Sequence, residues 1–131
     1  MEYSEMGKLV FFVDDDKMIL NLLDYTFNNS GGIVVKTFNN GEKCLNSLQD
    51  NPDSIILDHN FISVDSQFSF GFEILEKIRE KNKTVPVYIL SSEKAEILIS
   101  KYTSLNVKRF ISKDEFFIDS VRESISETFP A

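Results

Sequence analysis

Short apolar runs alternate with longer amphipathic segments along the chain. The first run, at 9–13, holds five apolar residues without a break, which is typical of a strand buried on both faces. Similar runs predict further strands at 33–38, 54–57, 85–90 and 106–111. The segments that follow the five strands carry apolar residues at helical spacing, and they predict helices at 17–29, 42–49, 71–81, 93–102 and 114–128.

Five repeats of strand and helix predict an α/β domain with a parallel sheet and helices on both faces. With five strands we expect the flavodoxin-like doubly wound (βα)5 fold, in which the strand order is 2-1-3-4-5. The 131 residues can form one core and are too few for two, so we expect a single domain over 1–131 with its core at about 8–128. We expect no output domain beyond it.

The pattern also makes specific packing predictions. The first helix carries an apolar stripe that includes Met18 and Leu22, and the last helix is expected to turn Phe116 toward the core. Residues 59–70 show no period and predict a long loop, with His59 at the mouth of a pocket.

Polar residues able to take part in chemistry follow four of the five predicted strands. They are Asp14, Asp15, Asp16, Asp58, Ser91, Ser92 and Lys113. Because ligands of such sheets bind at the carboxyl ends of the strands, we expect these residues in one crevice. Their carboxylates suit a hard cation such as Mg²⁺. Lys113 and the cation would neutralise a phosphoryl group that Asp58 attacks in line, while Asp16 stands where it would cap the first helix.

Four short motifs, each at a strand end, give the chain a resemblance to the receiver domains of response regulators in two-component signalling. The motifs are FVDDD at 12–16, IILD at 55–58, PVYILSS at 86–92 and FISK at 110–113. The resemblance implies that Asp58 accepts a phosphoryl group from a histidine of a partner kinase or phosphotransfer protein. It implies that Mg²⁺ (or Mn²⁺) is held by Asp14, Asp15, Asp58 and the backbone carbonyl of Asn60.

The resemblance also implies a switch. Ser91 is expected to supply the switch hydroxyl, Ser92 a backbone amide to the phosphoryl group and Lys113 its cation. Phe110 is expected to turn inward on phosphorylation. These changes would alter the surface of the fourth helix, fifth strand and fifth helix, to which a downstream protein would bind.

The sequence departs from the family's pattern at two places. A proline usually stands a few residues after the acceptor, where this chain has Phe61 and Ile62, and the loop to Gly71 is longer than usual. A second proline usually follows the lysine, where this chain has Asp114, a residue that is able to cap the last helix.

Composition excludes several classes of protein. The net charge of −7 argues against a nucleic-acid or membrane-surface binder, and no apolar run is long enough for a membrane helix. The N-terminal residues are polar and acidic, unlike a secretory signal. A single cysteine, Cys44, favours a reducing compartment, so we expect a cytoplasmic protein. Cys44 itself is expected to be a small buried apolar residue. We also expect a monomer or a weak homodimer.

Two readings compete with a receiver domain. A small phosphatase of the haloacid dehalogenase type would use Asp14 as its nucleophile and Asp16 as its acid/base, although the chain has little room for a cap. A flavin-binding flavodoxin would need Ser, Thr and Gly after the first strand, and three aspartates stand there instead. We therefore expect no enzyme beyond self-phosphorylation from small donors and autodephosphorylation.

Overall fold

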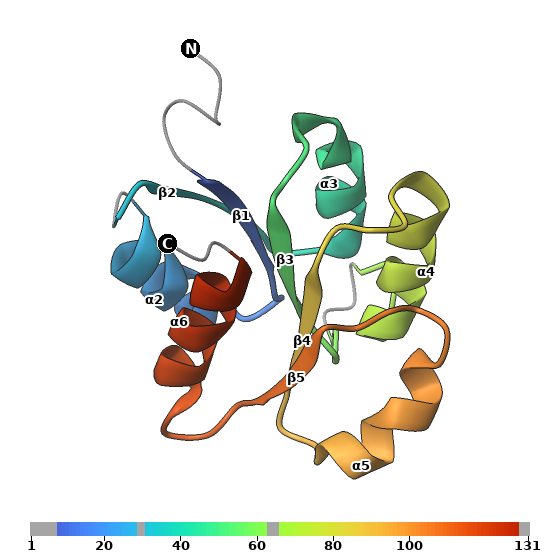
Figure 1. Ribbon diagram of the computed structural model, residues 1–131. Helices are drawn as coiled ribbons and strands as arrows, with labels where there is room; N and C mark the ends of the chain where they lie inside the picture. Colours follow the sequence, from blue (N-terminus) through green and yellow to red (C-terminus); the bar gives the residue numbers. More distant parts are fainter. Residues whose placement is uncertain (1–7, 29–30, 63–65, 129–131) are drawn as a thin grey trace.

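The five predicted strands form one parallel sheet. The computed structural model describes residues 8–28, 31–62 and 66–128, and it has the expected strand order β2-β1-β3-β4-β5 (Figure 1). The strands are β1 (Lys8–Val13), β2 (Ile33–Phe38), β3 (Ser54–Asp58), β4 (Val87–Ser91) and β5 (Arg109–Ser112). This arrangement confirms the flavodoxin-like fold, and it places the strand ends of β1 and β3 next to each other.

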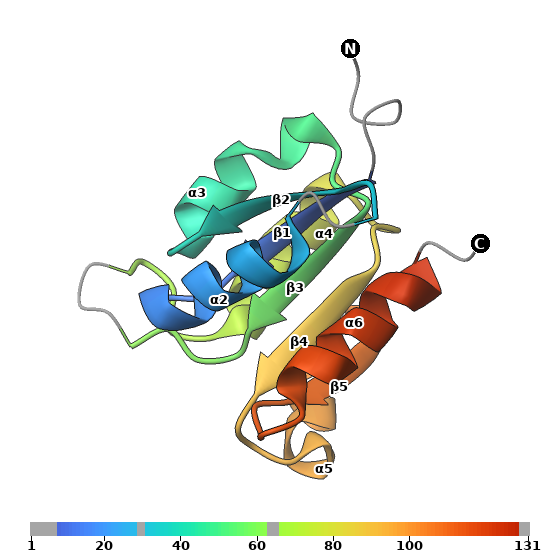
Figure 2. The same ribbon diagram turned by 90° about the vertical axis from the view of Figure 1, so that its left-hand side faces the viewer.

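Helices cover both faces of the sheet. The α-helices are α2 (Lys17–Phe27), α3 (Gly41–Asn46), α4 (Gly71–Lys81), α5 (Ala95–Leu98) and α6 (Phe117–Thr128), and the 3-10 helices are η1 (Leu48–Asp50) and η2 (Ile99–Tyr102). Helices α2 and α6 lie on one face, while α3, α4 and α5 lie on the other (Figures 1 and 2). No helix in the described ranges is both long and apolar enough to span a bilayer.

The core follows the alternation of side chains along the central strands. In β1, Leu9, Phe11 and Val13 point toward α3 and α4, whereas Val10 and Phe12 point toward α2 and α6. All five side chains are buried, as the unbroken apolar run predicts. Strand β1 therefore contributes side chains to the hydrophobic layers on both faces of the sheet.

Cys44 lies in the layer that α3 and α4 form, and it is fully buried as predicted. Burial raises the pKa of its thiol to about 12, so the thiolate is not available as a nucleophile at neutral pH.

Several packing predictions were wrong in detail. Met18 and Leu22 are 81% and 42% exposed, because the face of α2 that meets the sheet is formed by Leu20, Leu23 and Phe27. Phe116 is 61% exposed because α6 begins only at the next residue and Phe116 itself lies in the preceding turn.

Element boundaries also differ from the sequence prediction. The fourth helix is a single α-helical turn continued by η2 rather than one helix over 93–102. The first helix ends at Phe27 with Asn28 as its C-cap, and Asn29, the predicted end, lies outside the described residues.

A buried arginine joins α4 to the segments around it. The Arg79 side chain is almost fully buried, and its guanidinium donates to four backbone carbonyls. The acceptors and distances are Leu105 O at 2.8 Å, Val85 O at 2.9 Å, Asn106 O at 3.0 Å and Asn82 O at 3.3 Å. The guanidinium carries five N–H donors spread over a planar fork and can reach four separated carbonyls, whereas an ammonium group has only three donors on one atom. Arg79 thus fixes the end of α4 against the strand β4 and the turn before β5.

We predict that Arg79→Lys lowers the free energy of unfolding by about 2 kcal/mol or more, because it leaves buried carbonyls without donors. Arg122→Lys is the matched control, since Arg122 is exposed and pairs with Asp119 at 3.3 Å. It should change stability by less than about 0.5 kcal/mol. Urea denaturation followed by circular dichroism measures both, and equal effects would contradict the role of Arg79.

Candidate functional site

The ends of β1, β3 and β5 bring two buried carboxylates and one ammonium group together. Asp14 and Asp58 are 1% and 3% exposed. The Nζ of Lys113 lies 3.1 Å from Asp14 Oδ2 and 3.0 Å from Asp58 Oδ1. One cation therefore bridges two aspartates that come from different strands, and the convergence predicted from the strand ends is present.

Asp15 completes an acidic cluster with Asp14 and Asp58. One carboxylate oxygen of each residue lies within 4.8 Å of the others. Asp16 points elsewhere, because its carboxylate accepts from the amides of Met18 and Ile19 at 2.9 and 3.4 Å and caps α2 as predicted. The acidic triplet is thus divided between a helix cap and the cluster.

The charges of this cluster are not balanced by the lysine alone. Burial, followed by the charge of Asp14, raises the pKa of Asp58 from 3.8 to about 8, although Lys113 opposes the shift. Burial also raises the pKa of Asp14, against a hydrogen bond from the Asp16 amide and the charge of Lys113. For Lys113 burial acts to lower the pKa, but Asp58 and Asp14 outweigh it and the pKa rises.

A divalent cation fits this donor set. Three carboxylates share a small volume with one ammonium group, so the cluster carries excess negative charge whenever the aspartates are ionised. Carboxylate oxygens are the ligands that Mg²⁺ takes in proteins, usually one or two of them together with waters. The residues present therefore suit a hard divalent cation such as Mg²⁺, as expected from the sequence.

Ser91 lies at the end of β4 and is buried, whereas Ser92 is exposed. The Ser91 hydroxyl accepts from the amide of Glu93 at 2.9 Å, and the Ser91 carbonyl accepts from the amide of Lys113 at 2.8 Å. The serine is therefore tied to the residue that bridges the two aspartates. Its hydroxyl also helps to shape the turn that leads to α5.

His59 was expected at the mouth of the pocket, and this prediction was wrong. Its side chain is fully buried beside the rings of Phe70 and Phe72. The Nδ1 of His59 lies 2.7 Å from the hydroxyl of Tyr102. The aromatic residues of the loop were the sequence signal for this arrangement, because large aromatic side chains favour burial and indicate that the loop packs against the protein.

Tyr102 extends this contact to Phe110, the predicted switch residue. Its ring meets that of Phe110 edge to face, with centroids 5.6 Å apart. Phe110 is half-buried in β5, with its ring against the apolar layer on the α4 side of the sheet. A chain of contacts thus runs from the residue after Asp58 to the fifth strand.

Gly71 permits α4 to start directly behind strand β3. A Cβ at this position would overlap the carbonyl oxygen of Asp58 and lie 2.9 Å from the hydroxyl of Tyr102. The amide of Gly71 donates to the carbonyl of His59 at 2.7 Å. The absence of a side chain at Gly71 is therefore a requirement of the site.

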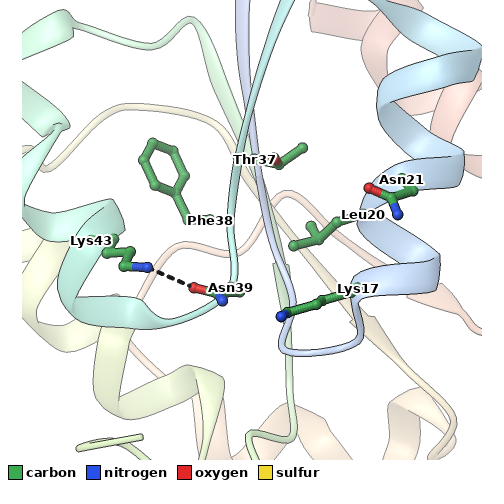
Figure 3. Close-up of a pocket in the computed structure, with 7 residues that line it drawn as sticks. All are labelled: Lys17, Leu20, Asn21, Thr37, Phe38, Asn39 and Lys43. Atoms are coloured by element: carbon green, nitrogen blue, oxygen red, sulfur yellow. Dashed lines mark hydrogen bonds between the residues drawn. The ribbon is translucent and has the colours of Figure 1, made fainter.

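A separate cavity of about 290 Å³ lies between α2 and the end of β2 (Figure 3). Lys17 and Lys43 enter it from opposite sides, and Lys43 Nζ donates to Asn39 Oδ1 at 3.3 Å. None of the three clustered aspartates lines this cavity. The acidic site and the cavity are thus distinct.

Comparison with known proteins agrees with this geometry. A family model described as the response regulator receiver domain matches residues 10–124. The alkaline phosphatase synthesis transcriptional regulatory protein PhoP of Bacillus subtilis (strain 168) is 30% identical over 92 residues. Those residues make up 70% of this chain and 36% of PhoP, so the match spans little more than a third of that relative.

Solved structures share the fold over nearly the whole chain. The receiver domain of the Francisella response regulator 1452 has a TM-score of 0.77 and 25% identity, and the alignment covers 93% of this chain and 96% of that one. TrrA of Thermotoga maritima in complex with Mg²⁺–BeF has a TM-score of 0.73 and 25% identity, covering 93% and 99%. The chemotaxis protein CheY4 of Vibrio cholerae, at 22% identity, shares the fold with a TM-score of 0.80 over 94% and 99%.

The sheet order, the acidic pocket at the ends of β1 and β3, and a family match over most of the chain all point to one assignment. The chain belongs to the response regulator receiver domain family.

Proposed function

We propose that this domain is a phosphoacceptor in a two-component pathway or phosphorelay, and that Asp58 is the residue phosphorylated. The observation that carries the proposal is the pairing of Asp58 with Lys113 at 3.0 Å inside the acidic cluster. The phosphoryl donor would be a histidine of a kinase or of a phosphotransfer protein. A bond forms between a carboxylate oxygen of Asp58 and phosphorus, and the bond from phosphorus to the donor nitrogen breaks.

Each residue of the site has a task in this transfer. Lys113 holds the Asp58 carboxylate and offsets the charge of the incoming phosphoryl oxygens. Asp14, Asp15, Asp58 and the carbonyl of Asn60 would hold Mg²⁺ or Mn²⁺. When bound, the cation would balance the negative charge on the phosphoryl group. Burial and the neighbouring Asp14 raise the pKa of Asp58, so the ionised form that reacts is disfavoured when no cation is bound.

Phosphorylation would change the surface formed by α5, β5 and α6. The Ser91 hydroxyl, now accepting from Glu93, would turn to donate to the phosphoryl group, to which the Ser92 amide also donates. Phe110 would then turn inward, and a downstream protein would recognise the altered surface. Small phosphoryl donors would also label Asp58, and the aspartyl phosphate would be lost by autodephosphorylation.

No observation favours the haloacid dehalogenase alternative. In that reading Asp16 would be the acid/base, yet its carboxylate is exposed and occupied in capping α2.

We predict that phosphoramidate with Mg²⁺ adds one phosphoryl group to the protein and that Asp58→Asn abolishes the addition, because the amide oxygen is not a nucleophile. Intact-mass spectrometry measures the product. Asp16→Asn is the matched control and should retain labelling. Labelling of the Asp58→Asn variant would assign the chemistry to another aspartate.

We also predict a specific pH dependence of stability without Mg²⁺. The pKa of Asp58 is near 3.8 in the unfolded chain and about 8 in the folded protein. Between these values the folded state binds a proton that the unfolded state does not, so the free energy of unfolding falls as the pH rises. The fall should be about 1 kcal/mol or more, since one pKa unit corresponds to about 1.4 kcal/mol.

Urea denaturation at several pH values tests this prediction. Asp58→Asn removes the titrating group, so its stability should vary less over the same range. Excess Mg²⁺ should stabilise the wild-type protein most at the alkaline end, where the carboxylates are ionised. Parallel pH profiles for the wild-type and variant proteins would contradict the electrostatic account.

A further inference from the structure

The loop after β3 reaches back to the acidic cluster through a backbone amide. The N–H of Ile62 donates to Asp15 Oδ2 at 2.7 Å. Asp15 is the half-buried member of the cluster, whereas Asp14 and Asp58 are held by Lys113. The contact joins residues 47 positions apart in the sequence, so it is a tertiary contact and not a local turn.

The residues before Ile62 are fixed by buried anchors. His59 is fully buried and lies 2.7 Å from the Tyr102 hydroxyl, and its backbone carbonyl accepts from Gly71. Phe61 is 4% exposed and packs in the core layer on the α4 side of the sheet. The buried side chains of His59 and Phe61 therefore anchor the backbone that carries the Ile62 amide.

A short antiparallel contact holds the same segment from the far side of the loop. Asn60 pairs with Phe70 in an isolated β-bridge, and the amide of Phe61 donates to the carbonyl of Ser69 at 2.9 Å. The Ile62 side chain itself is 87% exposed. Packing thus does not account for the position of Ile62, and its backbone amide makes the tertiary contact.

A hydrogen bond to a carboxylate ligand does two things. It favours the ionised form that a cation needs, and it fixes the orientation of the oxygens before the cation arrives. Outer contacts of this kind tune metal affinity even though they do not touch the metal. Lys113 contacts Asp14 and Asp58, and the loop amide of Ile62 donates to Asp15, so the loop contributes directly to the orientation of a third carboxylate of the cluster.

We propose that the Ile62 amide is a positioning group that orients Asp15 for Mg²⁺ binding. The inference rests on the proposed Mg²⁺ site and adds to it a contribution from the loop. It also gives the segment 59–62 a second role, because the Asn60 carbonyl that we expect on the cation belongs to the same anchored stretch.

Ile62→Pro tests the proposal because proline has no amide hydrogen. Ile62→Ala is the matched control, since it loses the same exposed side chain but keeps the donor. Mg²⁺ affinity is measured by isothermal titration calorimetry. We expect the proline variant to bind Mg²⁺ about tenfold more weakly than the alanine variant, as for the loss of other outer contacts. Equal affinities would overturn the proposal.

Urea denaturation of the Ile62→Pro and Ile62→Ala variants without Mg²⁺ separates the hydrogen bond from general damage to the loop. We expect both variants to fold, so that the weaker Mg²⁺ binding of the proline variant comes from the missing donor. A folded proline variant that binds Mg²⁺ as tightly as the alanine variant would overturn the proposal. Absence of Mg²⁺ binding by the wild-type protein would instead refute the proposed cation site itself.

A readout without metal tests the contact directly. In the wild-type protein the Ile62 amide should exchange its hydrogen at least about tenfold more slowly than in Asp15→Ala, because the bond must open before exchange. Hydrogen exchange followed by NMR measures this difference. Equal exchange rates would mean that the bond does not form in solution, and the proposal would fall even if the proline variant did not fold.

Discussion

The site depends on a single ammonium group placed between two buried carboxylates. Lys113 reaches Asp14 and Asp58 from the end of β5, so the three strands β1, β3 and β5 are joined by charge as well as by the sheet. Burying charges is unfavourable unless they are paired, and here two negative charges share one positive charge. The site therefore carries unbalanced negative charge when both aspartates are ionised, and a divalent cation or a proton can balance it. This unbalanced charge links the stability of the fold to the chemistry proposed for Asp58.

Much of the fold could be predicted from the sequence because the signals were local. The run at 9–13 is typical of a fully buried strand, and the carboxylates that follow such a strand lie at the edge of the sheet. The strand order followed from the alternation of strands and helices. The convergence of Asp14, Asp58, Ser91 and Lys113 followed from that order, since all four residues stand at strand ends.

The errors arose where packing between distant segments decides the outcome. His59 is a polar residue in a loop, and its burial depends on Tyr102, 43 residues away, and on the rings of Phe70 and Phe72. Met18 belongs to an apolar stripe wider than the surface that the sheet offers to α2. The Ile62 amide could not be identified from sequence at all, because every residue except proline carries the same backbone donor.

Gly71 has a consequence for how sequence variants of this domain should be interpreted. Replacing a glycine at the start of a helix is usually mild, and alanine there would normally favour the helix. At this position any side chain would press on the carbonyl of Asp58 and on the Tyr102 hydroxyl. A substitution at Gly71 would therefore disturb the acidic cluster as the loss of Asp58 does, although every acidic residue is intact. A genetic survey that inspects only the reactive side chains would classify such an allele as harmless.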